Sequence, residues 1–216
     1  MTRNKMSIFF TIEEPWQEAL QQAELASFEA AFAYSDAKPL SKKSHSVTYT
    51  KLLPNGARIF IKQDSWTGWR PIARAFIRLQ KPLPAVGRER AKMQKLNALG
   101  FNTAQVIAYG EKRRLGLPHQ GVMISLCVPG TAVDAITDEQ FRAVAAEQAR
   151  KTLKRLQELG CNWGRDCKPE HFFVTPELKV TLIDVERMKF GHKPLAEALC
   201  RKQFERFESL LKNANG

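Results

Sequence analysis

Two aspartates in the last third of the chain, Asp166 and Asp184, have the surroundings of groups that take part in phosphoryl transfer. Asp166 opens the run Asp-Cys-Lys-Pro-Glu-His, which brings Lys168 and His171 close behind it, and Asp184 ends the apolar run Val-Thr-Leu-Ile. Phosphoryl transfer needs a carboxylate that takes the hydroxyl proton, a cation beside the moving phosphate and groups that hold magnesium. We therefore expect Asp166 to act as the base and Lys168 to neutralise phosphoryl charge. Asp184 and His171 are the candidate metal ligands, although Asp184 could also be a structural aspartate that caps a turn.

A second pair of charged residues, Lys62 and Glu89, lies in the first half of the chain. Lys62 ends the apolar run Ile-Phe-Ile-Lys, and Glu89 lies in Arg-Glu-Arg within a helical pattern. Each residue alone is better explained as a surface charge, at a strand edge for Lys62 and on a solvated helix face for Glu89. Together they fit one task in nucleotide binding, in which the glutamate holds the lysine and the lysine holds two phosphates.

The hydrophobic pattern predicts which elements position these groups. A helix is expected over 13–34, and an Asn-Gly turn at 55–56 predicts a hairpin of strands. The remaining expected elements are helices over 69–99 broken at Pro82–Pro84, strands 103–109 and 121–128, helix 138–159, loop 161–170, strands 172–174 and 180–183, and helix 194–212.

The order of these elements predicts the fold class. Strands dominate the first part of the chain and helices the second, and the two parts meet near residues 128–130. We predict an α+β fold with a β-rich N-lobe, residues 1–128, that carries an N-terminal helical extension. Residues 129–216 are expected to form a small helical C-lobe that holds the catalytic loop, so that the two lobes make one catalytic unit.

Composition limits the partners and the compartment. The 216 residues carry a net charge of +12, which suits a nucleotide, a nucleic acid or a phosphate-bearing membrane surface, or else a merely soluble basic protein. No apolar run reaches the roughly 20 residues that span a bilayer. No signal peptide is expected in residues 1–20. The four cysteines lack metal-ligand spacing and are expected to be reduced thiols in the cytosol.

Residues 66–81 mix aromatic and basic side chains at helical spacing. One interpretation is an ordinary helix with a buried tryptophan stripe. The other is an element at a membrane surface, with tryptophan at the headgroup level and arginine on lipid phosphates.

The two aspartate motifs carry a resemblance to a known family. The run Asp166–His171 resembles the catalytic loop of the protein-kinase-like superfamily, and Leu182–Asp184 resembles its metal-binding segment. More closely, residues 45–190 resemble the lipopolysaccharide core sugar kinases, the Kdo kinase and heptose kinase group. The segments that carry this closer match are Gly68-Trp69, Leu79–Ala85, Arg88-Glu89, Leu96–Phe101, Arg165-Asp166, His171-Phe172 and Leu182–Asp184.

The resemblance implies a bilobal protein-kinase-like fold, use of ATP and Mg²⁺, and a sugar of the lipopolysaccharide inner core as acceptor. It implies Lys62 as the phosphate-binding lysine with Glu89 as its partner, Asp166 as the base, and His171 and Asp184 at the metal. The backbone of Met123 and Ser125 would hold adenine. Because no Gly-x-Gly-x-x-Gly run is present, Lys42, Lys43 and the hydroxyl groups of the basic, serine-rich stretch 40–47 would cover the phosphates.

The same resemblance implies a location on the cytoplasmic face of the inner membrane, with the lipopolysaccharide core and the anionic membrane surface as partners. The alternative is a degenerate kinase-like module that binds or responds to stress without transfer. Two departures motivate it: the glycine-rich loop is missing, and His171 replaces the usual asparagine. Nucleic-acid binding rests on charge alone and is not expected, because the basic residues are spread over the chain.

Overall fold

The chain folds into two units, each assembled from segments that are not continuous in sequence. The structure is a computed structural model that describes residues 6–36 and 38–213. The first unit comprises residues 1–91 and 105–127, and the second comprises 92–104 and 128–216. The two predicted lobes, 1–128 and 129–216, stay a prediction. The two units have nearly the same bounds, except that residues 92–104 belong to the second unit. The expectation of no signal peptide concerned residues 1–20, and of these residues 1–5 lie outside the described residues.

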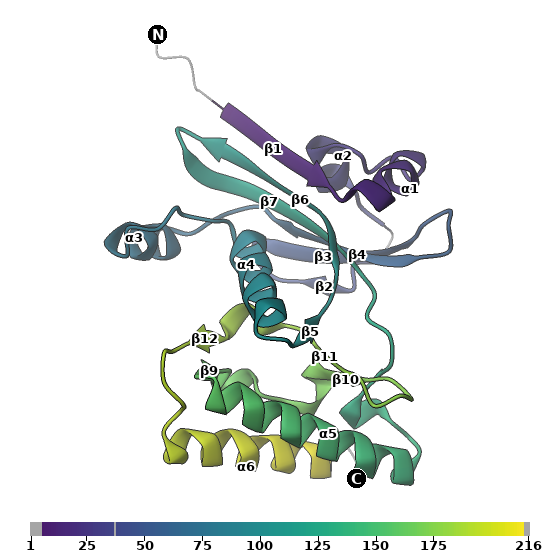
Figure 1. Ribbon diagram of the computed structural model, residues 1–216. Coiled ribbons are helices and arrows are strands. Elements are labelled where there is room, and N and C mark those ends of the chain that lie inside the picture. Colours follow the sequence, from purple (N-terminus) through teal and green to yellow (C-terminus); the bar gives the residue numbers. More distant parts are fainter. Residues whose placement is uncertain (1–5, 37, 214–216) are drawn as a thin grey trace. The chain divides into compact units, whose positions relative to one another are not determined.

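The first unit is built on a six-stranded antiparallel sheet (Figure 1). The strands follow the spatial order β1 (Met6–Ile12), β6 (Val106–Arg114), β7 (Leu117–Leu126), β4 (Arg58–Asp64), β3 (Ser46–Leu52) and β2 (Ser41–Lys42). The predicted hairpin is confirmed, because β3 and β4 pair in register around the Asn55-Gly56 turn. Gly56 has a φ of +83°, and the Ala57 amide donates to Asn55 Oδ1 at 3.1 Å, as this turn requires.

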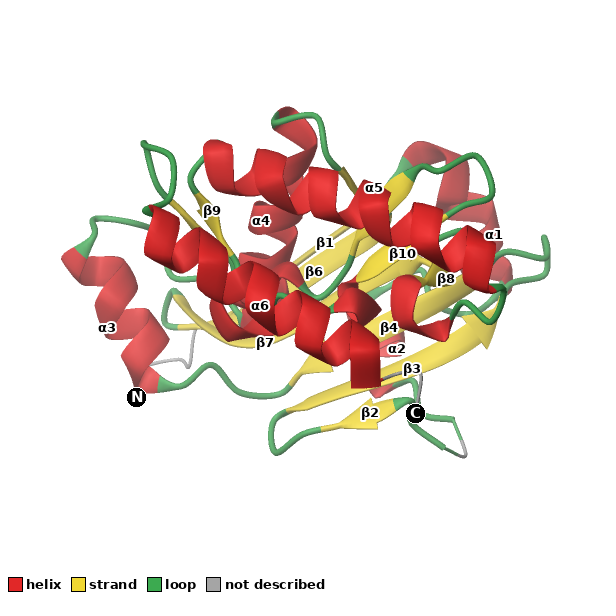
Figure 2. Ribbon diagram, turned by 90° about the horizontal axis from the view of Figure 1, so that it is seen from below, coloured by secondary structure: helices red, strands yellow, loops and turns green. Residues whose placement is uncertain are grey.

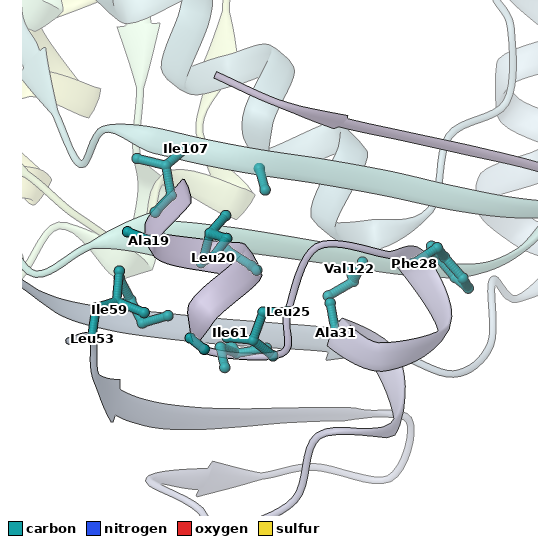
Figure 3. Packing of buried hydrophobic residues seen from close by; sticks show 13 residues of the cluster. Ala19, Leu20, Leu25, Phe28, Ala31, Leu53, Ile59, Ile61, Ile107 and Val122 are labelled. Carbon is teal, nitrogen blue, oxygen red and sulfur yellow. The ribbon is translucent and has the colours of Figure 1, made fainter. Parts of the chain in front are cut away.

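One face of this sheet is covered by a short 3₁₀ turn, η1 (Glu14–Trp16), and two short helices, α1 (Gln17–Gln22) and α2 (Phe28–Ala33). Their apolar side chains meet Ile59 and Ile61 of β4 and further buried residues of β6 and β7 (Figure 3). Each fully buried isoleucine or leucine contributes about 1.5–3 kcal/mol relative to exposure. Because side chains alternate along a strand, Lys62 and Asp64 point to the opposite face from Ile59 and Ile61.

Two further helices belong to the connection between β4 and the rest of the chain. α3 (Trp69–Ile77) lies in the first unit, and α4 (Ala85–Ala98) begins in the first unit and ends in the second. This confirms the predicted helical segment with its break at Pro82–Pro84.

The second unit contains a small four-stranded sheet of spatial order β5 (Asn102–Thr103), β11 (Val180–Leu182), β10 (Phe172–Val174) and β8 (Thr131–Ala132). Beside it run the long helices α5 (Glu139–Glu158) and α6 (Glu197–Asn213), side by side in both views (Figures 1 and 2). The strands β9 (Cys161–Asn162) and β12 (Lys189–Phe190) pair with each other, and η2 (Val133–Ala135), η3 (Gly164–Asp166), η4 (Pro169–His171) and η5 (Val185–Arg187) are single turns. The predicted helix 138–159 is confirmed by α5.

Three sequence expectations about elements are wrong in detail. The helix expected over 13–34 is interrupted, because Glu24 has a φ of +59° and Ser27 caps a new helix by accepting from the Ala30 amide. The strand expected over 103–109 is split between β5 and β6, which belong to different sheets. The edge strand β1 is an addition that the pattern did not predict. No helix in the described part of the chain has the length and hydropathy needed to cross a bilayer.

Candidate active site

The pair Lys62 and Glu89 is formed in the first unit. Lys62 Nζ lies 2.5 Å from Glu89 Oε2, and the side chains are only 20% and 9% exposed. Lys62 points from β4 toward α4, which carries Glu89 in its second turn. The structure therefore brings together the two residues that the sequence paired, while their role toward a nucleotide stays a prediction.

Asp64 holds the start of α4 against the same strand. Its Oδ2 accepts from the Ala85 amide at 2.6 Å, and the residue is 2% exposed. A carboxylate at the first turn of a helix satisfies a free amide and stabilises the helix dipole. Since Asp64 and Lys62 share one face of β4, this bond fixes the helix that places Glu89. Sequence reasoning missed Asp64, although an aspartate two residues after the lysine was a usable signal.

The residues predicted to hold adenine, Met123 and Ser125, lie inside a central strand. In β7, Met123 faces Lys62 of β4 and Tyr109 of β6, and Ser125 faces β4 and β6 in the same way. Their backbone amides and carbonyls lie in the ladders on both sides, and both residues are buried. The role of Met123 and Ser125 toward adenine stays a prediction.

Lys42 and Lys43 lie at the far edge of the same sheet. Lys42 pairs with Val47 in the β2–β3 hairpin, and the Lys43 amide donates to the Ser46 carbonyl at 2.8 Å. Both residues are exposed. The hairpin thus presents two cations on a strand edge without a glycine-rich loop.

The second unit carries the catalytic-loop residues on two consecutive 3₁₀ turns. His171 Nδ1 lies 2.7 Å from the Asp166 carbonyl oxygen, and because a carbonyl only accepts, Nδ1 carries the proton. The free ring nitrogen, Nε2, lies 3.7 Å from Asp184 Oδ2 and 3.4 Å from Glu170 Oε1. The loop therefore turns the Nε2 edge of the imidazole toward two carboxylates.

Trp163 contacts both His171 and the backbone of Asp184. Its ring is 1% exposed and stacks on His171 with centroids 5.7 Å apart, and its Nε1 donates to the Asp184 carbonyl at 3.3 Å. Asp184 has a left-handed backbone, with φ 49° and ψ 49°, a conformation that aspartate tolerates better than most residues. Trp163 thus fixes both the histidine ring and the backbone of the aspartate, a role that the sequence did not indicate.

Charged partners surround the two predicted catalytic residues. Arg187 Nε lies 3.5 Å from Asp166 Oδ2, and Arg187 is 76% exposed. Lys168 Nζ donates to Glu170 Oε1 at 2.7 Å, and this bond lowers the pKa of Glu170. Arg187 was missed by sequence reasoning, because its proximity to Asp166 depends on how the two turns pack.

The side chains near Asp184 could hold magnesium only together with phosphate oxygens of the substrate. Within residues 6–36 and 38–213, no group of three or more His, Cys, Asp or Glu side chains is arranged to hold a metal ion. Magnesium in phosphotransfer sites is commonly bound by one or two carboxylates together with phosphate oxygens and water. The half-exposed carboxylate of Asp184 meets that requirement, whereas imidazole is a poor magnesium ligand, so His171 fits better as a neighbour of the metal site.

Comparison with known proteins gives both a family and a fold. The sequence profile of the lipopolysaccharide kinase (Kdo/WaaP) family matches residues 65–196, a range that includes Glu89, Asp166, Lys168, His171 and Asp184. No curated protein matches the chain in sequence.

Two solved structures illustrate the fold. WaaP in complex with acyl carrier protein is similar with a TM-score of 0.59 and 16% identity, over 93% of this chain and 80% of that chain. An aminoglycoside-3'-phosphotransferase of type VIII is similar with a TM-score of 0.51 and 12% identity, over 94% of this chain and 97% of that chain. These likenesses confirm the predicted α+β, protein-kinase-like fold.

Proposed function

Because the chain belongs to the lipopolysaccharide kinase (Kdo/WaaP) family, we propose that it transfers the γ-phosphoryl group of ATP to a hydroxyl of an inner-core sugar, Kdo or heptose. The observation that carries the proposal is the loop in which His171 binds the Asp166 carbonyl and faces Asp184. His171 thus connects the backbone of the proposed proton acceptor, Asp166, to the carboxylate of the proposed magnesium ligand, Asp184. The family match covers it completely.

Asp166 is the proton acceptor in this proposal. Its carboxylate would take the proton of the sugar hydroxyl while the hydroxyl oxygen attacks the γ-phosphorus and the bond to the β,γ-bridging oxygen breaks. Arg187 places a positive charge 3.5 Å from that carboxylate. An exposed guanidinium there is also suited to orient an anionic group of the acceptor.

Lys168 and Asp184 serve the phosphate side. Lys168 now pairs with the half-exposed Glu170, so it must exchange this carboxylate for phosphate oxygens to stabilise the moving phosphoryl group. Asp184 would hold magnesium together with those oxygens, and magnesium when bound neutralises charge on the β- and γ-phosphates. Lys62, held by Glu89, would bind two phosphates of the nucleotide, and Lys42 and Lys43 would cover them.

The proposed place of action is the cytoplasmic face of the inner membrane, where the acceptor sugar is carried on a lipid. The basic surface, with a net charge of +12, supports attraction to that anionic surface. Since WaaP was solved in complex with acyl carrier protein, an acyl carrier protein is a further candidate partner. Nucleic acid is not among the proposed partners.

The test is transfer of label from γ-labelled ATP to purified inner-core lipopolysaccharide. Wild type should label the acceptor, and Asp166→Asn should lower the rate by at least about a hundredfold, as expected for loss of a positioned base. Asp138→Asn is the matched control, since Asp138 caps α5 by accepting from the Phe141 amide and asparagine caps equally well. Magnesium-dependent ATP binding without transfer to any sugar acceptor would instead support the degenerate binding module.

A further inference from the structure

The helix α3 exposes large apolar side chains that a soluble surface normally avoids. Trp69 is 68% exposed, Phe76 56% and Ile77 83%, and Leu79 just after the helix is 97% exposed. Among the residues of the helix only Ile72 is buried. Such a cluster marks a surface that contacts something other than water.

The exposed side chains are sorted into two stripes. At 100° per residue, Trp69, Phe76 and Ile77 fall on one face of the helix. Arg70, Arg74 and Arg78 recur every fourth residue beside that face, and all three are exposed. An apolar stripe flanked by a row of arginines is typical of a helix that lies in a membrane interface.

The charge around α3 has a single sign. Residues 65–88 contain five basic residues and no aspartate or glutamate, between Asp64 and Glu89. Lys81, which is 69% exposed, adds to the row of arginines although its Nζ lies 3.7 Å from Glu111. An anionic partner is therefore required to match this segment.

The connection that follows α3, at Pro82 and Leu83, is held by hydrogen bonds from β6 and α4. The buried Arg113 donates to the Pro82 carbonyl at 2.9 Å and to Glu111 at 2.8 Å, and Arg88 donates to the Leu83 carbonyl at 2.9 Å. Leu79, with φ +53°, ends the helix. In Figure 1, α3 lies apart from α1 and α2. The apolar side chains of Trp69, Phe76 and Ile77 are exposed.

We propose that α3 binds the surface of a bilayer that contains anionic phospholipids. The ring of Trp69 lies at the headgroup level, the side chains of Phe76, Ile77 and Leu79 enter the acyl boundary, and the three arginines bind lipid phosphates. A bilayer can take up the exposed stripe without a surface of matching shape. A folded acidic protein would need a surface whose shape is complementary to α3. A lipid-linked acceptor sugar would then be met at the same surface.

The experiment is sedimentation of the full chain with vesicles, in the absence of ATP and acceptor. Vesicles of phosphatidylglycerol and phosphatidylethanolamine should bind wild type, and vesicles of phosphatidylcholine alone should bind it far more weakly. Each basic residue near an anionic bilayer strengthens binding about fivefold, so Arg70→Gln, Arg74→Gln and Arg78→Gln together should weaken it roughly a hundredfold. Since no phosphoryl transfer is involved, failure here leaves the proposed kinase activity standing, and the reverse also holds.

A matched control removes the same charge elsewhere. Lys151→Gln, Lys154→Gln and Lys202→Gln change exposed positions on α5 and α6 and should weaken binding far less. Trp69→Ser with Phe76→Ser and Ile77→Ser should abolish the binding that remains at high salt. Circular dichroism and thermal unfolding should show all three triple variants folded, because the replaced side chains are exposed.

Two results would overturn the proposal. One is equal vesicle binding by the α3 arginine variant and the control variant. The other is loss of binding to an acidic protein such as an acyl carrier protein in the α3 variants, with vesicle binding unchanged. Quenching of tryptophan fluorescence by brominated lipid checks the depth, and Trp69→Phe should remove most of that quenching.

Discussion

The ion pair between Lys62 and Glu89 gives the sharpest quantitative prediction. Lys62→Met and Glu89→Leu each remove one charge of a pair whose atoms lie 2.5 Å apart. Loss of one partner costs 3–5 kcal/mol in a fully buried pair and about 0–1 kcal/mol in an exposed one. With side chains 20% and 9% exposed, this pair lies nearer the buried limit.

We expect Glu89→Leu to lower the free energy of unfolding by about 2–3 kcal/mol, because the lysine charge stays largely desolvated. Lys62→Met should cost about 1–2 kcal/mol, since the remaining carboxyl group can take up a proton. The double variant should lose at most about 1 kcal/mol, because two apolar side chains then replace the pair. The coupling energy between the two sites is therefore about 2 kcal/mol or more.

The assay is urea unfolding of the four proteins, followed by circular dichroism, with hydrogen exchange of the β4 amides as a local probe. Lys112→Met, on β6, which β7 separates from β4, is a control that removes a lysine without touching the pair. Calorimetry adds a functional readout, in which Lys62→Met should weaken ATP binding at least about tenfold through loss of a charge-assisted contact. Additive penalties, with a coupling energy below about 0.5 kcal/mol, would refute the reasoning.

Three further predictions concern Gly130, Cys167 and Asp184 of the second unit, with Gly116 of the first unit as a control for Gly130. Gly130→Ala should cost at least about 2 kcal/mol, because φ is +90° and the new Cβ would lie 2.4 Å from the Val174 carbonyl oxygen. Gly116→Ala, with φ +80° but open space, should cost only about 1 kcal/mol in the same unfolding assay, and equal losses would contradict the steric argument. Burial raises the pKa of the Cys167 thiol to about 12, so above the ordinary thiol pKa the unfolded chain releases a proton that the folded chain keeps. The contribution of Cys167 to stability should therefore be complete below the ordinary thiol pKa and fall by up to about 1.4 kcal/mol per pH unit toward pH 12. Cys167→Ala should make the slope shallower by that amount, while the buried Cys161 and Tyr109, whose pKa values are also raised, keep part of it. Asp184→Asn should keep the left-handed backbone and change the free energy of unfolding by less than about 0.5 kcal/mol, yet abolish the magnesium dependence of ATP binding measured by calorimetry; retained dependence would exclude Asp184 as the ligand.

Local signals in the sequence were sufficient for much of the fold. The Asn55-Gly56 turn between alternating runs predicted the β3–β4 hairpin, and the long apolar period of 138–159 predicted α5. The breaks were harder, because α1 and α2 share one apolar pattern, which the left-handed backbone of Glu24 and the Ser27 cap interrupt. β1 was not predicted because its side chains are mostly exposed on the sheet edge, which leaves little alternation to detect.

The candidate site divides in the same way. Asp166, Lys168, His171 and Asp184 were found because they lie close together in sequence, within a recognisable motif. Trp163 and Arg187 were not found, since their contacts with His171 and Asp166 arise only when the turns pack.

The nucleotide side shows the limits of assigning roles from sequence. The family resemblance, and no local pattern, placed adenine on the backbone of Met123 and Ser125. The strand expected over 121–128 already contained both residues, and in the structure they lie in β7, which ends at Leu126 between two neighbouring strands. A strand and its register do not fix what its backbone groups bind, so the role of these residues toward adenine stays a prediction.

The most direct measurement of the central claim is the mass of the acceptor after reaction. Inner-core lipopolysaccharide is incubated with ATP, magnesium and the protein, then split by mild acid so that core sugars and lipid anchor are weighed separately. The account predicts one added phosphate on the core sugars with wild type and with Asp138→Asn, and none with Asp166→Asn. Phosphate found only on the lipid anchor, or equal phosphorylation by Asp166→Asn, would contradict it.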